Sequence, residues 1–166
     1  MGGDWERFAA DNGALELLPP EPLGQLVKSF IADDSTAQLY SDIYAKVRRT
    51  GEPLTFPLRC DGPDVVRELS MTISPTDDGF DVRSALVSEV ARAAIPVLVA
   101  PSADADALVL SCGWCKRIDV RGHWFEIEVA VQMLSLFRQA RVPAITHGIC
   151  DNCMKRMEAL VSAQDQ

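Results

Sequence analysis

The sequence predicts an α+β protein with a small cysteine-rich module at its C-terminal end. Residues 33–51 show a helical pattern with capping residues at both ends. Three runs within 54–86 then alternate apolar and polar residues, and the last third holds two C-x-x-C pairs. Helices followed by an antiparallel meander are typical of the α+β class. We therefore expect two parts, residues 1–100 and residues 101–166.

Two helices are predicted before the sheet. Apolar residues recur at helical spacing within 23–31, so we expect a short helix there that packs by one face. Asp33 is a good N-cap for a longer helix, and Gly51 stands where a left-handed C-terminal residue belongs. The apolar residues of this second helix step by four: Leu39, Ile43 and Val47.

A three-stranded antiparallel meander is predicted next. The alternating runs lie at 54–60, 69–73 and 80–86. Turn-forming residues fill 61–64 and 75–79 between them. One face of the resulting sheet should be buried.

The patterns at the start of the chain and after the meander are weaker. Residues 5–14 end in Asn-Gly and predict either a strand end or a helical turn. After the meander we expect a helix at 89–94, an extended segment at 95–100 and a linker at 101–106. The linker sets the boundary between the two parts.

Four of the five cysteines form two C-x-x-C pairs, Cys112 with Cys115 and Cys150 with Cys153. Each two-residue turn directs two thiolates and nearby backbone N–H groups to one point. The two pairs therefore predict a tetrahedral site for one structural Zn²⁺. His147 lies three residues before Cys150, so it is a candidate replacement ligand or a hydrogen-bond donor to a thiolate.

The segment between the pairs has to bring them together. We expect one amphipathic helix over 119–141, ended by Pro143, with His123 near its start. Its apolar face would consist of Trp124, Ile127, Val131 and Leu134. The indole rings of Trp114 and Trp124 are expected to pack over the two C-x-x-C turns that hold the metal. A terminal helix over 154–163 should place Met157 and Leu160 inward.

Other interpretations of the cysteines remain open. Disulfides are one, although no charged-then-apolar signal segment opens the chain and a reducing, cytoplasmic location is expected. A thiol–disulfide oxidoreductase is another, with Cys112 and Cys115 opening a helix after a strand at 108–110. That interpretation leaves Cys150 and Cys153 without a role. Covalent haem attachment is excluded because no histidine follows either pair.

Composition restricts the function classes. A net charge of −8 argues against a protein that binds nucleic acid through its overall electrostatic field. A zinc-containing nucleic-acid-binding regulator is therefore the weaker alternative. No apolar run reaches the length of about 20 residues that a membrane span needs. No catalytic grouping of Ser, His and Asp or of Cys and His can be assembled, so we do not expect an enzyme.

Two resemblances add to this interpretation. The order of helix, capped helix and meander resembles a PAS domain, with the local motifs Trp5-x-x-Phe8-Ala9-x-x-Asn12-Gly13 and Leu58-Arg59-Cys60-Asp61. The C-terminal part resembles a module appended to bacterial PAS and sensor proteins, with Cys112-x-Trp114-Cys115-Lys116-Arg117-Ile118, Trp124-x-x-x-Glu128 and Thr146-His147-Gly148-Ile149-Cys150-x-x-Cys153. A PAS sheet has five strands, and the resemblance implies that the first strand is missing or very short in this sequence.

The PAS resemblance implies a sensory or interaction module that acts through a protein partner or effector domain in trans. Haem and flavin are not expected in the PAS-like part, because both histidines lie beyond residue 100 and the surroundings of Cys60 do not resemble a flavin-adduct motif. Cys60 is expected to be a small buried apolar residue. A homodimer would cover the edge left by the missing strand, unless Trp5 and Phe8 pack on their own sheet.

Overall fold

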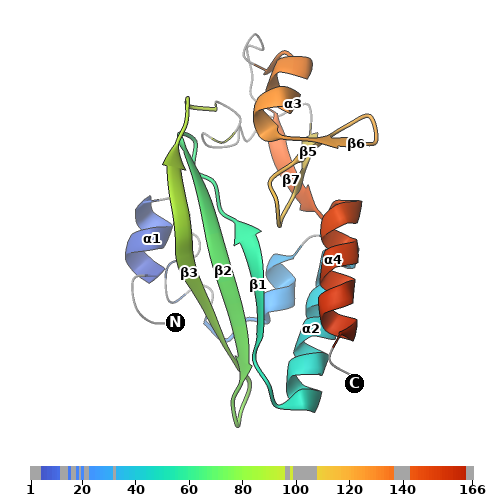
Figure 1. Cartoon of the computed structure of the whole chain (residues 1–166). Helices are drawn as coiled ribbons and strands as arrows, with labels where there is room; N and C mark the ends of the chain where they lie inside the picture. Colours follow the sequence, from blue (N-terminus) through green and yellow to red (C-terminus); the bar gives the residue numbers. More distant parts are fainter. Residues whose placement is uncertain are drawn as a thin grey trace. The chain divides into compact units, whose positions relative to one another are not determined.

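A computed structural model of the 166-residue chain describes residues 5–11, 15, 18, 20, 23–31, 33–95, 98, 108–136 and 143–163. The chain divides into two compact units, Met1–Ile31 and Ala32–Gln166. The boundary expected near residue 100 therefore lies inside the larger unit. The protein belongs to the α+β class, as the sequence predicts, with helices and two separate sheets (Figure 1).

The smaller unit contains helix α1 (Trp5–Asp11) and the 3-10 helix η2 (Val27–Phe30). The short helix expected within 23–31 is present as η2, but the expectation that it packs by one face is wrong. Only four residues are helical, and none of them is buried. The expected Asn-Gly turn after α1 and the side chains of Trp5 and Phe8 lie outside the described residues.

Helix α2 (Asp34–Thr50) opens the larger unit and has both predicted caps. The carboxylate of Asp33 accepts a hydrogen bond from the backbone N–H of Thr36 at 2.7 Å. Gly51 ends the helix in the left-handed region with φ of 73°, where its N–H donates to the carbonyl of Val47. These caps satisfy backbone groups that a helix end leaves unpaired.

Sheet A is the predicted meander, with β1 (Leu54–Arg59), β2 (Val65–Pro75) and β3 (Phe80–Ala91) in that order and antiparallel (Figure 1). Strand β3 continues through residues for which a helix at 89–94 was expected, so that prediction is wrong. The alternation of β3 is broken by a bulge opposite Glu68 and Leu69, which hides the strand period in the sequence.

Sheet B is a second sheet that the sequence analysis did not foresee. Its order is β6 (His123–Phe125), β5 (Ile118–Val120), β4 (Leu108–Cys112) and β7 (Ala144–Gly148). The strand expected at 108–110 is confirmed as part of β4. The single helix expected over 119–141 is wrong, because the β5–β6 hairpin precedes a short helix α3 (Ile127–Met133).

A two-residue turn explains that correction. Arg121 and Gly122 have φ of 56° and 85°, and they connect strands in which Val120 pairs with His123. Positive φ at both central residues is the requirement of the tight hairpin turn that matches strand twist. His123 therefore lies on β6, exposed, and not at a helix start.

Helix α4 (Asp151–Ser162) is the predicted terminal helix, with Cys150 as its N-cap residue and Cys153 in its first turn. Its Met157 is fully buried and its Leu160 is half-buried. Helices α2 and α4 lie side by side in Figure 1. The ammonium group of buried Lys46 on α2 joins them, because it donates to the carbonyls of Leu160 at 2.8 Å and Val161 at 2.6 Å.

One apolar core joins α2, sheet A and the cysteine pairs. It combines residues from both sides of the boundary expected near residue 100. Full burial of each large aliphatic or aromatic side chain stabilises the fold by roughly 1.5–3 kcal/mol. The buried members are Leu39, Ile43, Val47, Leu54, Phe56, Ile73, Cys112, Trp114, Cys150, Cys153 and Met157. A second core under sheet B contains Val109, Ile118, Val120, Ile127, Ala130 and Val131 among its residues.

Candidate metal centre

The two cysteine pairs meet because β4 and β7 are parallel neighbours. Leu108 pairs with Ala144, and the register runs to Cys112 opposite Gly148. Parallel strands end at the same edge of a sheet. The pair that begins at Cys112 and the pair that begins two residues after Gly148 are therefore adjacent, although residues 116–149 separate them in the chain.

The four thiols form one cluster. The Sγ atoms of Cys112, Cys115, Cys150 and Cys153 all lie within 4.8 Å of one another. The Sγ atoms of Cys115 and Cys150 are 3.7 Å apart. A tetrahedral Zn²⁺ with Zn–S bonds of about 2.3 Å requires sulfur atoms about 3.8 Å apart. The cluster can therefore hold a metal ion with only a small contraction.

Backbone hydrogen bonds fix the first turn of the centre. The N–H of Lys116 donates to the carbonyl of Cys112 at 3.0 Å, and Lys116 has φ of 61°. The N–H of Gly113 donates to the carbonyl of Gly148 at 2.8 Å, which ties the first turn to β7. The N–H of Cys150 points to the Sγ of Cys112 at 3.4 Å. Donors directed at a sulfur atom stabilise its thiolate form.

The thiols perturb one another's protonation. Hydrogen bonds from the side chains of Cys115 and Cys153 lower the pKa of Cys112. The hydrogen bond to Cys112 raises the pKa of Cys115 to about 11, and hydrogen bonds to Cys112 and Cys115 raise the pKa of Cys153. One thiolate is thus favoured while its neighbours keep their protons. A bound cation would remove this conflict, because it stabilises thiolates at all four positions.

The centre is shielded unevenly. Cys112, Cys150 and Cys153 are buried, whereas Cys115 is half-buried. The ring of Trp114, which is 3% exposed, lies 5.4 Å from the Tyr40 ring and 6.5 Å from the Phe56 ring. The expected packing role of Trp114 is therefore confirmed, and Trp124 also packs against the same core.

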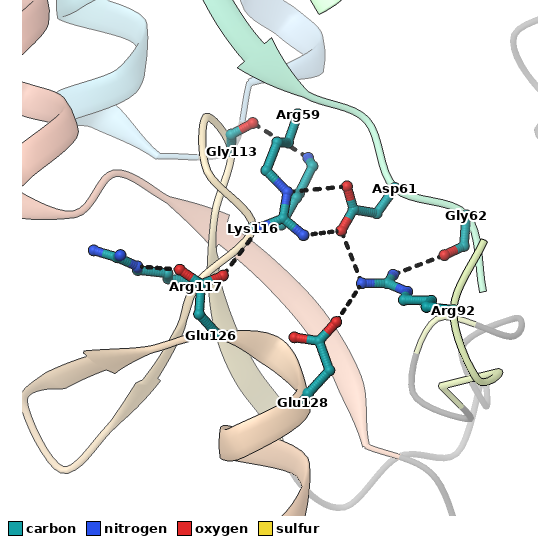
Figure 2. Close-up of polar contacts among 9 residues, drawn as sticks. All are labelled: Arg59, Asp61, Gly62, Arg92, Gly113, Lys116, Arg117, Glu126 and Glu128. Carbon is teal, nitrogen blue, oxygen red and sulfur yellow. Dashed lines mark hydrogen bonds and ion pairs between the residues drawn. The ribbon is translucent and has the colours of Figure 1, made fainter. Parts of the chain in front are cut away.

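An ion-pair network lies next to the first cysteine pair (Figure 2). The carboxylate of Asp61 is 1% exposed and accepts hydrogen bonds from Arg59 and from Arg92, the latter at 3.0 Å. The guanidinium of Arg92 also donates to Glu128 at 3.0 Å and to the carbonyl of Gly62 at 2.8 Å. The network thus joins the ends of β1 and β3 to the start of α3.

Glu126 extends the network to Arg117, which follows the first cysteine pair. It accepts one hydrogen bond from Arg59 at 3.0 Å and another from Arg117 at 2.8 Å (Figure 2). Burial alone would lower the pKa of Arg59, but Asp61 and Glu126 raise it, so this side chain stays charged. The backbone N–H of Arg59 donates to the carbonyl of Trp114 at 2.7 Å. The end of β1 is therefore bound directly to the first cysteine turn.

The other candidate residues lie outside the cluster. His147 is exposed on β7, opposite Ser111, and is not in the group of candidate ligand atoms. His123 is also exposed and Cys60 is half-buried, and neither belongs to the cluster of four thiols. The helix that the oxidoreductase interpretation needs after Cys112 is absent, because a turn leads there into β5.

Sequence reasoning missed the charged residues around the centre. Asp61 was assigned to a turn, and Arg117 was named only within the motif of the C-terminal module. The only local signal was the alternation of opposite charges at Arg59 and Asp61, which does not identify distant partners such as Glu126 and Arg92.

Comparisons with known proteins add no relative. No family model matches the chain, and no significant match is found among curated proteins or solved structures. Within the described residues, no helix is long and apolar enough to cross a membrane. The fold class and the cysteine cluster are therefore the findings on which a function can be based.

Proposed function

We propose that Cys112, Cys115, Cys150 and Cys153 hold one structural Zn²⁺. The observation that carries this proposal is the spacing of their Sγ atoms, all within 4.8 Å of one another. An all-sulfur set favours Zn²⁺ over harder cations such as Mg²⁺ or Ca²⁺, which prefer oxygen ligands. Burial of three of the four cysteines is typical of a closed structural site rather than a catalytic site with an open position.

We further propose that the chain is a non-enzymatic signalling module of cytoplasmic bacterial proteins, built from a PAS-like domain and the zinc module. The support is the order of α2 and the antiparallel meander of sheet A, together with the motif around the cysteines. The backbone hydrogen bond from Arg59 of β1 to Trp114, in the first cysteine turn, supports a rigid link between the PAS-like domain and the zinc module. Such a module would transmit its signal to a protein partner.

The test of the zinc proposal is a pair of cysteine variants. We expect about one zinc per chain by elemental analysis of the purified protein, and loss of that zinc in Cys150→Ser. The C-terminal module should then unfold, because the free energy of metal binding is part of its folding free energy. Cys60→Ser is the matched control, since Cys60 lies outside the cluster. Retention of zinc and of thermal stability in Cys150→Ser would contradict the proposal.

The same samples test the oxidoreductase alternative. A structural site leaves Cys60 as the only readily reactive thiol under native conditions. Zinc-free protein in which Cys112 and Cys115 cycle between dithiol and disulfide would instead favour that alternative.

A homodimer is the form of assembly that we propose. Among the described residues, β3 pairs only with β2, and it exposes Val82, Leu86 and Val90. An apolar edge strand of this kind is commonly covered by another chain. Light scattering at several concentrations should show a dimer that gains population as concentration rises. A monomer at every concentration would remove this proposal.

A further inference from the structure

Two cavities adjoin beside the candidate metal centre. The first has a volume of about 400 Å³ and the second about 350 Å³. Both are lined by Arg59, Cys115 and Arg156, so they share a wall. Their volumes fall within the range of roughly 300–1,000 Å³ that is usual for small-molecule sites.

The first cavity has a mainly apolar lining. Phe56 and Leu58 of β1, Leu69 of β2 and Val87 of β3 line it together with Trp114, and Glu68 is the one acidic residue of this lining. Such a surface gains free energy when an apolar group displaces water from it. The cavity is therefore suited to the hydrocarbon or aromatic part of a ligand.

The second cavity is lined by charged groups of both signs. Arg59, Arg117 and Arg156 line it together with Glu126 and with three of the proposed metal ligands, Cys115, Cys150 and Cys153. Arg59 and Arg117 are engaged with Glu126, and Arg59 also with Asp61. No hydrogen bond or ion pair engages the guanidinium of Arg156 in the part of the chain that the structure describes. Its guanidinium is thus available where the two cavities join.

The position of Arg156 follows from helix α4. It lies three residues after Cys153, so both project from the same side of the helix. A guanidinium binds a carboxylate through two parallel N–H bonds. A competing role for Arg156 is to balance the charge of about −2 that four thiolates and one Zn²⁺ carry.

We infer that these adjoining cavities bind an organic anion with an apolar body, of the aryl or acyl monocarboxylate class. The apolar body occupies the first cavity, and the carboxylate pairs with Arg156 at the junction. This inference rests on the proposed function, because the walls formed by Trp114 and Cys115 require the assembled metal centre. It names the class of signal that the sensory module would detect.

Two probes with the same carbon skeleton test the role of charge: 4-phenylbutyrate and its uncharged analogue 4-phenylbutanol. Each is titrated into the full-length protein as purified, with the ¹H–¹⁵N resonances of the Trp114 indole and of the Leu58 and Leu69 amides as readout. We expect saturable shifts of these resonances with 4-phenylbutyrate, and weaker binding of 4-phenylbutanol.

Arg156→Gln and Lys155→Gln form a matched pair of variants. Both residues are exposed on α4 and carry the same charge, but Lys155 lines neither cavity. Arg156→Gln should weaken 4-phenylbutyrate binding by about tenfold and leave 4-phenylbutanol nearly unchanged, a difference of about 1.4 kcal/mol. Lys155→Gln should leave both affinities within about twofold of the unsubstituted protein.

Several results would overturn the inference. These are the absence of saturable shifts, equal affinity for the two probes, or equal effects of the two substitutions. If Arg156→Gln loses zinc but keeps its affinity for 4-phenylbutyrate, Arg156 only balances the negative charge of the zinc–thiolate centre and does not bind the ligand. Zinc content is measured on every sample. A zinc-loaded protein that binds no probe refutes this inference alone, whereas a protein without zinc refutes the proposed metal centre.

Discussion

Replacing the buried carboxylate of Asp61 is the sharpest stability test that the structure offers. The Asp61 side chain is 1% exposed and accepts three hydrogen bonds, two from Arg59 and one from Arg92. Asp61→Asn removes the negative charge while preserving the size of the side chain. Two guanidinium groups, 19% and 9% exposed, then lose their shared counter-charge.

The expected loss of unfolding free energy is about 3 kcal/mol. Breaking a buried ion pair by removing one partner costs roughly 3–5 kcal/mol. The lower end applies here, because Arg59 keeps its bond to Glu126 and Arg92 keeps its bonds to Glu128 and the carbonyl of Gly62.

Asp81→Asn is the matched control. Asp81 pairs with Arg83 two residues away, as Asp61 pairs with Arg59, but its side chain is 41% exposed and that of Arg83 is 81% exposed. An exposed pair of this kind contributes roughly 0–1 kcal/mol. Urea unfolding, followed by circular dichroism at fixed zinc content, measures both variants. With a slope of about 2 kcal/mol/M, Asp61→Asn should lower the midpoint by about 1.5 M.

Equal midpoints for Asp61→Asn and Asp81→Asn would refute the reasoning. A decrease below about 0.5 M for Asp61→Asn would also refute it, because the network would then contribute no more than a surface pair. An altered slope would indicate a changed denatured state or loss of two-state unfolding.

Two further predictions concern helix α2. Lys46→Met should lower the unfolding free energy by about 2 kcal/mol, because the hydrogen bonds from the Lys46 ammonium group to the carbonyls of Leu160 and Val161 are lost. Lys155→Met is the control at an exposed position, and it should change the unfolding free energy by less than about 0.5 kcal/mol in the same urea assay. Burial raises the pKa of Tyr40 from 10.0 to about 12, so the stability that its neutral form contributes is complete below pH 10 and is lost as pH rises to about 12. Thermal melts across this window should show a smaller pH dependence for Tyr40→Phe, and an unchanged dependence would contradict this assignment.

Local signals in the sequence predicted much of sheet A and helix α2, which contacts it. The caps at Asp33 and Gly51 fixed the bounds of α2, and turn residues separated the strands of the meander. These features depend on hydrogen bonds between residues close in sequence. The four cysteines could likewise be grouped from their spacing alone.

The region between the cysteine pairs was mispredicted because two periodicities overlap there. Trp124, Ile127 and Val131 have helical spacing, yet Trp124 belongs to β6. The positive φ values at Arg121 and Gly122 mark the turn, but the sequence shows only a single glycine there. A glycine at that point was the available signal for a hairpin.

Contacts between distant segments were beyond reach of these patterns. The parallel pairing of β4 with β7 depends on residues about 36 positions apart, and no local motif specifies it. The burial of Lys46 could not be predicted either, because its acceptors lie in the last turn of α4. The partners of Asp61 likewise come from β1, the residue after β3, and, through Arg59, the residue before α3.

The tight turn at Arg121 and Gly122 is a site where the protein should tolerate an inserted sequence. Both residues are exposed, and the two cysteine pairs are aligned by β4 and β7 rather than by the length of the chain between them. The entropy of closing a flexible loop grows only slowly with its length. A peptide tag or a fluorescent reporter inserted between Arg121 and Gly122 should therefore leave the thiol cluster assembled, which makes this turn the natural attachment point for labelling the intact protein.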